Sequence, residues 1–342
     1  MYAAARSLLF RLDAERAHEL TLDLFKRFPK LTTGPFARGA VDDPVELLGL
    51  RFANRVGLAA GLDKNGECLE AWGRLGFGFV EIGTVTPRAQ PGNPRPRMFR
   101  LPEHTAIINR LGFNNKGVDH LLARVAEAQE TGVFRGVLGI NIGKNFDTPI
   151  ERAADDYLIC LRKVYQRASY ITLNISSPNT RNLRELQSED PLRALLAQLK
   201  GEGEALAQAH GKRTPILVKI APDVDDGQLD VIARVARESG IDGLIATNTT
   251  IERAAVAGHP RAGEAGGLSG APLKPLADRT LAALRARVGD DFTLIGVGGI
   301  TDAQGARDKR AAGADLVQIY SGFVYRGPAL VRACAEALRA PR

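Results

Sequence analysis

The sequence has 342 residues, 44% of them hydrophobic and 25% charged, a composition that excludes disordered, collagen-like and coiled-coil chains. Its formal net charge of +7 is compatible with binding to nucleic acid, anionic lipid or an anionic substrate. The alternative is that this charge has no functional significance. The cysteines Cys68, Cys160 and Cys334 form no CxxC pair, which argues against a disulfide framework, a zinc ribbon or an iron–sulfur cluster.

The first 40 residues have a helical pattern. Asp13 can cap a helix in which Ala17, Leu20, Leu24 and Phe28 recur at steps of three and four residues. Seven basic residues outnumber four acidic ones in this segment, so the helices are basic and amphipathic, and they either lie in a membrane interface or pack on the rest of the protein. The basic residues are Arg6, Arg11, Arg16, Lys26, Arg27, Lys30 and Arg38.

Short apolar strands alternate with helix-length segments after residue 45. Strands that are apolar at nearly every position are typical of sheets buried on both faces. Eight such units favour a (β/α)8 barrel, since a doubly wound sheet has fewer strands and a GxGxxG first turn, which here reads GLDKNG. The predicted strands are Val56–Gly61, Phe79–Gly83, Val137–Gly143, Tyr170–Ser176, Ile216–Ala221, Gly243–Asn248, Thr293–Gly298 and Leu316–Tyr320, and a last helix is predicted at Pro328–Leu338.

Polar residues gather at the carboxyl ends of these strands, where barrel enzymes carry their chemistry. Glycines in Gly298–Gly299 and Ser321–Gly322 let backbone amides approach a phosphate, and the segment Gly266–Gly270 either adds amides or is a flexible turn. Lys219 directly follows Ile216–Val218, so it should project into the barrel mouth, where a buried lysine needs an anionic partner such as a reduced flavin. Lys64 ends the first strand; for both lysines a solvated position is the alternative.

Five asparagines cluster near the strand ends. The side-chain amide offers both donors and an acceptor, which suits the edge of a pyrimidine-dione, although asparagine is also common in turns. The five histidines are scattered without an HxH or HExxH pair, and GxSxG is absent, so we predict neither a metal site nor a serine triad. The asparagines are Asn109, Asn141, Asn174, Asn179 and Asn248.

Eight motifs follow one another along the chain: AAGLDKNG, EIGTVTPRAQPGNPRPRMFRL, INRLGFNN, INIGKN, LNISSPNTRNLR, TNTT, GGLSG and GVGGI. With these motifs the chain closely resembles the quinone-dependent (class 2) dihydroorotate dehydrogenases, from about residue 13 to its end. The resemblance implies an α/β fold with an FMN-binding (β/α)8 barrel over residues 41–342, preceded by a helical, membrane-associating extension over residues 1–40 that gives quinone access. It also implies oxidation of dihydroorotate to orotate in pyrimidine biosynthesis, with one non-covalent FMN per chain.

The resemblance implies a role for each matching position. The FMN contacts would be Ala60, Gly61, Leu62, Asp63, Lys64, Thr84, Asn141, Asn174, Lys219, Thr247, Gly270, Gly299, Tyr320 and Ser321. The substrate contacts would be Lys64, Asn109, Arg110, Leu111, Gly112, Phe113, Asn174, Asn179, Asn248 and Thr249. Ser177 would be the catalytic base, with Thr180 relaying the proton and Phe113 shielding the site. Serine is a poor base when free, and a turn hydroxyl beside Pro178 is the alternative for Ser177.

For the second half-reaction, the resemblance implies a tunnel lined by His18, Arg100 and Tyr320 that leads a membrane quinone to FMN beneath the N-terminal segment. Pro87–Pro102 would form a structured wall of it, a solvated basic loop being the alternative. The expected partners are dihydroorotate or orotate, a quinone and a lipid surface, with neither nucleic acid nor a required protein partner. We expect a peripheral position on the cytoplasmic face of the cell membrane.

Rival interpretations account for less of the sequence. A class 1 enzyme, which uses fumarate or NAD, carries a cysteine as its base, and no cysteine lies between residues 170 and 190. A flavin-dependent dihydrouridine synthase acting on tRNA would need a catalytic cysteine and an RNA-binding tail. A lipid-binding module without activity would not explain the polar residues at all eight strand ends.

Overall fold

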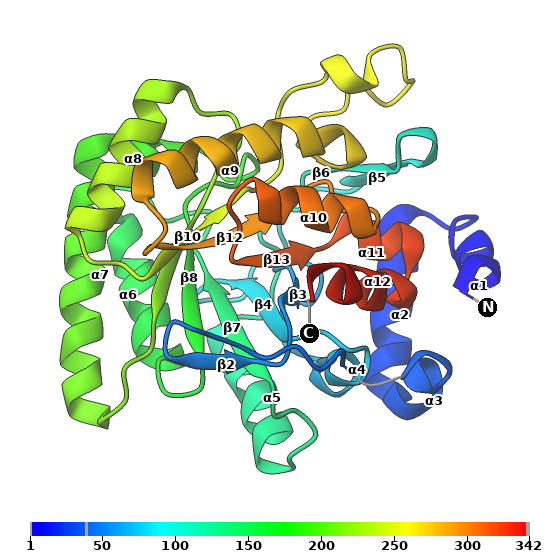
Figure 1. Cartoon of the computed structure of the whole chain (residues 1–342), viewed down its shortest axis with the longest axis horizontal. Coiled ribbons are helices and arrows are strands. Elements are labelled where there is room, and N and C mark those ends of the chain that lie inside the picture. Colours follow the sequence, from blue (N-terminus) through cyan, green and yellow to red (C-terminus); the bar gives the residue numbers. More distant parts are fainter. Residues whose placement is uncertain (1, 38–39, 340–342) are drawn as a thin grey trace.

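Eight parallel strands pair in chain order and close into a barrel, which confirms the predicted (β/α)8 fold (Figure 1). The computed structural model describes residues 2–37 and 40–339, and the basic residue Arg38 counted above lies outside them. Each predicted strand is present, and most end one to three residues earlier than expected. The barrel strands are β3 (Val56–Leu58), β4 (Phe79–Val85), β7 (Val137–Ile142), β8 (Tyr170–Asn174), β9 (Ile216–Ile220), β10 (Gly243–Ala246), β12 (Thr293–Val297) and β13 (Leu316–Ile319).

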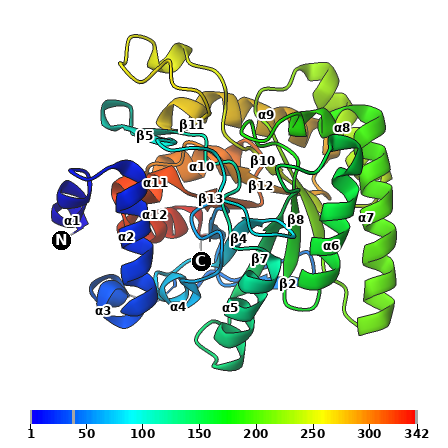
Figure 2. The same cartoon turned by 180° about the vertical axis from the view of Figure 1, so that it is seen from behind.

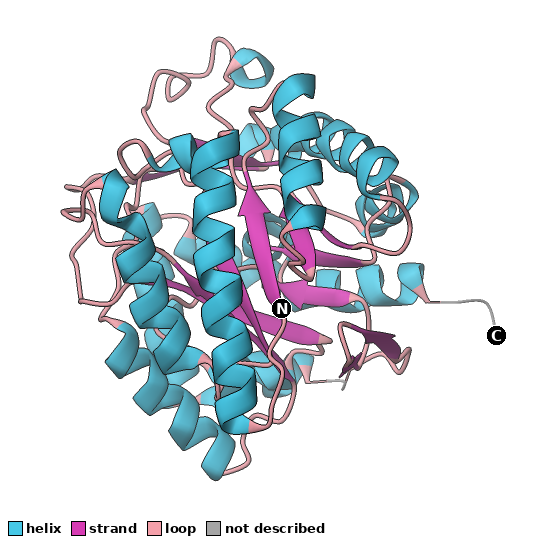
Figure 3. Cartoon of the chain, turned by 90° about the vertical axis from the view of Figure 1, so that its left-hand side faces the viewer, coloured by secondary structure: helices cyan, strands magenta, loops and turns pink. Residues whose placement is uncertain are grey.

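Helices surround the barrel and cover the outer faces of its strands (Figure 3). Apolar side chains between the strands and these helices form the largest buried cluster, which explains why the strand sequences are apolar on both faces. The helices after the strands are α4 (Leu69–Arg74), α5 (Val118–Glu130), α6 (Ala153–Val164), α7 (Glu189–His210), α8 (Asp226–Glu238), α9 (Lys274–Val288), α10 (Ala303–Ala311), α11 (Ser321–Arg326) and α12 (Pro328–Leu338). The last of these has the predicted bounds.

Large and small side chains alternate inside the barrel. A Cβ at Gly57 would lie 2.3 Å from the Phe79 ring, and one at Gly139 would lie 2.2 Å from the Tyr170 ring, so glycine makes room for each aromatic. Below them, the hairpin of β1 (Val45–Leu47) and β2 (Leu50–Phe52) was not predicted. Its Phe52 is fully buried and meets Phe79 edge to face, so this hairpin closes the amino-terminal end of the barrel.

A small antiparallel sheet stands beside the carboxyl ends of the barrel strands. It consists of β5 (Met98–Leu101), β6 (Ala106–Asn109) and β11 (Gly267–Gly270), in the order β11-β6-β5. Of the two alternatives for Gly266–Gly270, the flexible turn is wrong, because residues 267–270 pair with β6. Its register places Gly267 opposite Asn109.

The N-terminal segment forms three helices on one side of the barrel, next to α4 and α11 (Figures 1 and 2). They are α1 (Tyr2–Leu9), α2 (Ala14–Arg27) and α3 (Pro29–Thr33). The predicted cap is confirmed, since Asp13 Oδ1 accepts hydrogen bonds of 3.0 Å from the backbone N–H groups of Glu15 and Arg16. No helix within the described ranges is both long enough and apolar enough to cross a bilayer.

A buried ion pair fixes α2 to the segment that precedes β5. Arg97 donates from Nε and Nη2 to the Glu15 carboxylate, at 3.0 and 2.7 Å, and both side chains are only about one-twentieth exposed. Arg97 also donates from Nη1 to the backbone oxygens of Pro91 and Asn93, at 2.6 and 2.7 Å. Arg97 thus attaches the segment 87–102 to α2, which argues against a solvated loop. That this segment forms a wall of a quinone tunnel stays a prediction.

Replacing Glu15 by alanine is expected to lower the free energy of unfolding by about 3–5 kcal/mol, because Arg97 would keep a buried charge without its partner. Urea unfolding followed by circular dichroism measures this loss. Glu19→Ala is the matched control on the same helix, since the Glu19 side chain is half exposed and pairs with the exposed Arg95. It should cost at most about 1 kcal/mol. Equal losses for the two variants would contradict this account.

Candidate active site

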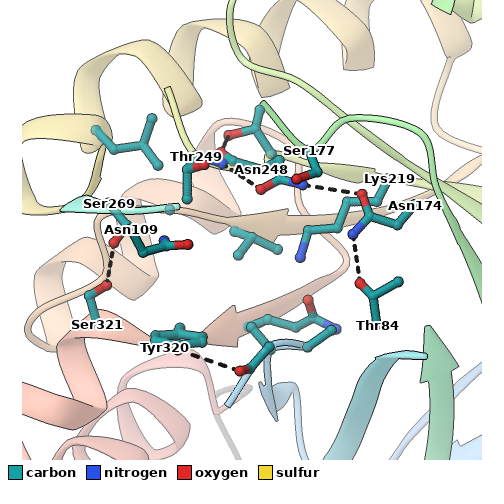
Figure 4. Close-up of a pocket in the computed structure, with 18 of the residues that line it drawn as sticks. Thr84, Asn109, Asn174, Ser177, Lys219, Asn248, Thr249, Ser269, Tyr320 and Ser321 are labelled. Atoms are coloured by element: carbon teal, nitrogen blue, oxygen red, sulfur yellow. Dashed lines mark hydrogen bonds between the residues drawn. The ribbon is translucent and has the colours of Figure 1, made fainter. Parts of the chain in front are cut away.

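The carboxyl ends of the strands surround a pocket with about 970 Å³ of empty space (Figure 4). Most of the predicted site residues meet there, although they come from the ends of seven barrel strands, all except β7, and from β6, β11 and the loops beside them. Those that line it are Ala60, Gly61, Lys64, Thr84, Asn109, Leu111, Gly112, Phe113, Asn174, Ser177, Asn179, Lys219, Thr247, Asn248, Thr249, Gly270, Gly299, Tyr320 and Ser321.

Five of the residues predicted for FMN, substrate or catalysis do not line this pocket. Asp63 is buried, and its carboxylate accepts from the backbone of Glu67 and Cys68 and from the Trp72 indole. Arg110 turns outward to pair with Glu264 at 2.9 Å. The other three are Leu62, Asn141 and Thr180. Leu62 lines a second cavity, and Asn141 accepts a hydrogen bond from the Thr84 hydroxyl behind the pocket wall. Thr180 is buried and lies three residues after Ser177 in the chain.

Asn174, at the end of β8, is the centre of an amide network. Its Nδ2 donates to Thr84 Oγ1 at 2.8 Å, and its Oδ1 accepts from Asn248 Nδ2 at 3.2 Å. Asn248 Nδ2 also donates to Ser176 Oγ at 3.0 Å. These contacts join the ends of three strands, so the amide groups are held in place before any ligand binds, as Figure 4 shows.

Ser177 lies on the loop after β8 and is 5% exposed. Its Oγ accepts a hydrogen bond from the backbone N–H of Asn179 at 3.2 Å, and Ser177 lines the pocket together with Lys219 of the neighbouring strand (Figure 4). Arg184 steadies the same loop by donating to the Ser176 backbone oxygen and to Asp223. The hydroxyl is therefore a fixed group that faces the ligand space.

The segment 109–113 forms one wall of the pocket. Gln90 Nε2 donates to the backbone oxygen of Gly112 at 3.0 Å, and Asn93 Nδ2 donates to that of Arg110 at 2.8 Å. Phe113 has a φ of +54°, in the left-handed region that a bulky side chain rarely adopts. Strained backbone conformations of this kind are typical of functional sites. In this conformation the buried Phe113 side chain lines the pocket.

Two lysines place positive charge on the pocket. Burial, with a smaller effect of the Arg97 charge, lowers the pKa of the Lys64 ammonium to about 8. Burial likewise lowers the pKa of Lys219, while the nearby carboxylate of Glu81 acts in the opposite direction. The Lys219 ammonium points into the pocket in Figure 4, as expected from its place on β9.

Backbone groups rather than side chains line the far end of the pocket. Gly270, Gly299 and Gly322 lie there, and a Cβ at Gly299 would come within 2.3 Å of Lys274. Ser269 and Ser321 share a hydrogen bond of 2.8 Å between their hydroxyls beside these glycines. The result is an open cradle of amide and hydroxyl groups.

A second cavity, with about 1430 Å³ of empty space, lies between the N-terminal helices and the barrel. His18, Arg100 and Tyr320 all line it, as predicted for the tunnel, and Tyr320 also lines the first pocket. Burial, together with the Lys64 charge, lowers the pKa of His18 to about 3, so this imidazole is neutral near pH 7. Apolar side chains form most of the remaining wall: Leu9, Phe10, Leu22, Phe25, Phe36, Trp72, Met98, Ile107 and Phe323.

Some lining residues were not predicted. Ser269 lies on β11, which the sequence did not reveal, and Gln318 lies inside the last barrel strand. Glu81, just below the pocket, is a fully buried charge in the strand FVEIGTV. A charged residue within an apolar strand is a signal that could have identified it.

Comparisons with known proteins agree with this geometry. The model of the family described as dihydroorotate dehydrogenase matches residues 44–340. The chain is 58% identical to the dihydroorotate dehydrogenase (quinone) of Leptothrix cholodnii, over 99% of this chain and 98% of that protein, and 58% identical to that of Pseudomonas putida W619, over 99% of each. The crystal structure of DHODH from Eimeria tenella in complex with ferulenol is similar, with a TM-score of 0.87 and 38% identity over 97% of this chain and 93% of the other. The chain therefore belongs to the dihydroorotate dehydrogenase family.

Proposed function

We propose that this chain oxidises dihydroorotate to orotate in pyrimidine biosynthesis and passes the electrons through bound FMN to a membrane quinone. One observation carries the proposal: a polar pocket and a large apolar cavity meet at a shared residue, Tyr320. Such an arrangement suits an enzyme with one polar and one apolar substrate that exchange electrons through a group between them. The name shared by the two bacterial relatives above supports the same reaction.

The pocket fits FMN. The cradle of Gly270, Gly299 and Ser321 suits the phosphate, because backbone amides can approach it closely. Lys219 suits the negative charge that a reduced flavin carries near N1. Gln318 Oε1 is buried and has no protein partner within the described ranges, so it is an acceptor available to the ring. When bound, FMN supplies the acceptor for the hydride.

The substrate is proposed to lie against the amide network. Asn109, Asn174, Asn179, Asn248 and Thr249 present donors and acceptors to the pyrimidine edge, and the Lys64 ammonium neutralises its carboxylate. Segment 109–113 forms the facing wall. Asp63 and Asn141 would act through their neighbours, since neither side chain lines the pocket.

Ser177 is proposed as the base that takes the proton from C5 of dihydroorotate while the hydride leaves C6, which forms the C5=C6 double bond of orotate. Its hydroxyl faces the ligand space. Thr180, three residues further along the same buried loop, is proposed to pass the proton on through water. Phe113 is proposed to exclude bulk solvent from this step.

Residues 1–40 are proposed as the quinone-access segment on a barrel of residues 41–342. Of the nine large apolar side chains that are exposed in the described ranges, five lie on or beside α1–α3: Leu8, Leu20, Leu24, Phe28 and Leu31. With the basic residues of the same helices, this surface suits an anionic lipid headgroup layer. We place the protein at the cytoplasmic face of the membrane.

The KM for dihydroorotate is expected to rise as the pH increases through about 8, the lowered pKa of Lys64. Below that pH the ammonium is charged and attracts the carboxylate; above it the charge is lost. Steady-state kinetics between pH 6.5 and 9.5 measure this profile. Lys64→Met should show a high KM that no longer changes across this range, and a parent profile that is flat through pH 8 would contradict the assignment of Lys64.

The proposal is tested by the flavin and by the product. Purified protein is expected to release one FMN per chain on denaturation, and with dihydroorotate and a short-chain quinone it should form orotate in amounts equal to the quinone reduced. Fumarate and NAD should not replace the quinone. A folded protein that neither contains flavin nor binds added FMN, or that uses fumarate as readily, would refute the proposal.

A further inference from the structure

A charged residue lies inside the barrel, below the active-site pocket. Glu81, on β4, is fully buried, whereas barrel interiors are usually filled by valine, isoleucine and leucine. Three uncharged groups donate to its carboxylate: Asn141 Nδ2 at 2.8 Å, the Tyr170 hydroxyl at 2.8 Å and Gln318 Nε2 at 2.6 Å. These donors satisfy the oxygens of the carboxylate, as the burial of such a group requires.

An opposite charge lies across the same barrel interior. Lys219 projects from β9 onto the pocket floor and is 6% exposed. Its pKa is lowered by burial and raised by the field of Glu81, which is the one charged group that acts on it appreciably. Burying either charge alone is costly, so the two charges compensate each other in the folded protein.

The geometry leaves Lys219 available for a ligand. The carboxylate of Glu81 is occupied by Asn141, Tyr170 and Gln318, and no ion pair within 4.0 Å joins it to Lys219 in the described part of the chain. Glu81 thus provides a counter-charge at a distance while the ammonium keeps its hydrogen-bond donors. It also fixes the amide of Gln318, which lines the pocket floor.

We propose that Glu81 is a positioning residue that balances the charge of Lys219 and thereby sets the reduction potential of the bound flavin; this rests on the proposed function. Reduction adds two electrons and one proton to the ring, so the ring gains one negative charge. Lys219 favours that charge and Glu81 opposes it. The potential then reflects the difference between the two fields.

The test measures the flavin midpoint potential by spectroelectrochemistry at pH 6, in the holoenzyme. Glu81→Gln, which keeps the shape and removes the charge, is expected to raise the potential by about 30 mV, equal to tenfold tighter relative binding of reduced flavin. Lys219→Met should lower it, and the double variant should lie close to the parent. Tyr170→Phe is the matched control, because it removes a hydrogen-bond donor to Glu81 but no charge. It should change the potential by less than a third of the change that Glu81→Gln causes.

Thermal unfolding of the flavin-free proteins gives a second measurement. Glu81→Gln should lower Tm because Lys219 loses its counter-charge, and adding Lys219→Met should restore most of the loss. If Glu81→Gln does not fold, recovery of folding in the double variant would equally support charge compensation between Glu81 and Lys219. An unchanged or lower potential in Glu81→Gln, or no recovery in the double variant, would overturn the inference. A parent protein that binds no flavin would instead refute the proposed function and leave the stability comparison valid.

Discussion

Replacing Ser177 by alanine is expected to slow flavin reduction by dihydroorotate about 10²- to 10⁴-fold, the usual contribution of a positioned base. Ser177 Oγ faces the pocket, and its protein contact within the described residues is an accepted bond from Asn179 N–H, so alanine removes a reacting group and disturbs little else. Anaerobic stopped-flow absorbance measures the rate, and titration with orotate measures binding, which should be unchanged.

Ser177→Cys is the informative partner variant. A thiol ionises more readily than a hydroxyl, so it should recover part of the lost rate. Ser176→Ala is the matched control, because the Ser176 hydroxyl is bonded to Asn174 and Asn248 and does not line the pocket. Flavin reduction by Ser177→Ala at the parental rate would show that the base is another group.

Removing residues 1–40 is expected to abolish quinone reduction while dihydroorotate still reduces the flavin. Most of the apolar wall of the second cavity comes from residues 1–40, so the truncated protein would keep only the barrel face of it. The lost segment has a formal charge of +3, worth about 3 kcal/mol at an anionic membrane surface, or about 100-fold in partition. Turnover with a short-chain quinone and sedimentation with anionic vesicles measure the two effects.

A point variant separates lipid binding from folding. Leu31 is 75% exposed on α3, so Leu31→Glu should preserve the fold and weaken vesicle binding. Val133→Glu, at an exposed apolar residue far along the chain from these helices, is its control and should bind vesicles as the parent does. Parental quinone turnover by the truncated protein would contradict the assignment of the N-terminal helices.

The sequence predicted the barrel because its strands are apolar at nearly every residue and their ends are polar. Local patterns also located the α2 cap at Asp13 and the last helix. The antiparallel sheet of β5, β6 and β11 escaped prediction because its strands have four residues each and β11 pairs with β6 across about 160 positions of the chain. Pairing at such separation leaves no periodic signal in either segment.

The candidate site was likewise predictable in part. Residues at strand ends, such as Lys219 and Asn174, could be placed from the barrel geometry alone, whereas most of the finer assignments depended on the resemblance to a family. The sequence could not show that Arg110 turns outward to Glu264. It also could not show that the Asp63 carboxylate accepts hydrogen bonds from three nearby donors. The role of Glu81 does not follow from the strand pattern, because a strand that is apolar at nearly every residue gives no reason to expect a buried carboxylate.

The most direct test of the account follows the flavin through one complete cycle. Anaerobic enzyme is mixed with one equivalent of dihydroorotate, and then separate portions receive a quinone or fumarate. We predict that the flavin absorbance near 450 nm is bleached as orotate forms and returns within milliseconds to seconds with quinone, but not with fumarate. A flavin that dihydroorotate does not bleach, or that fumarate restores as fast as quinone, would contradict the central claim.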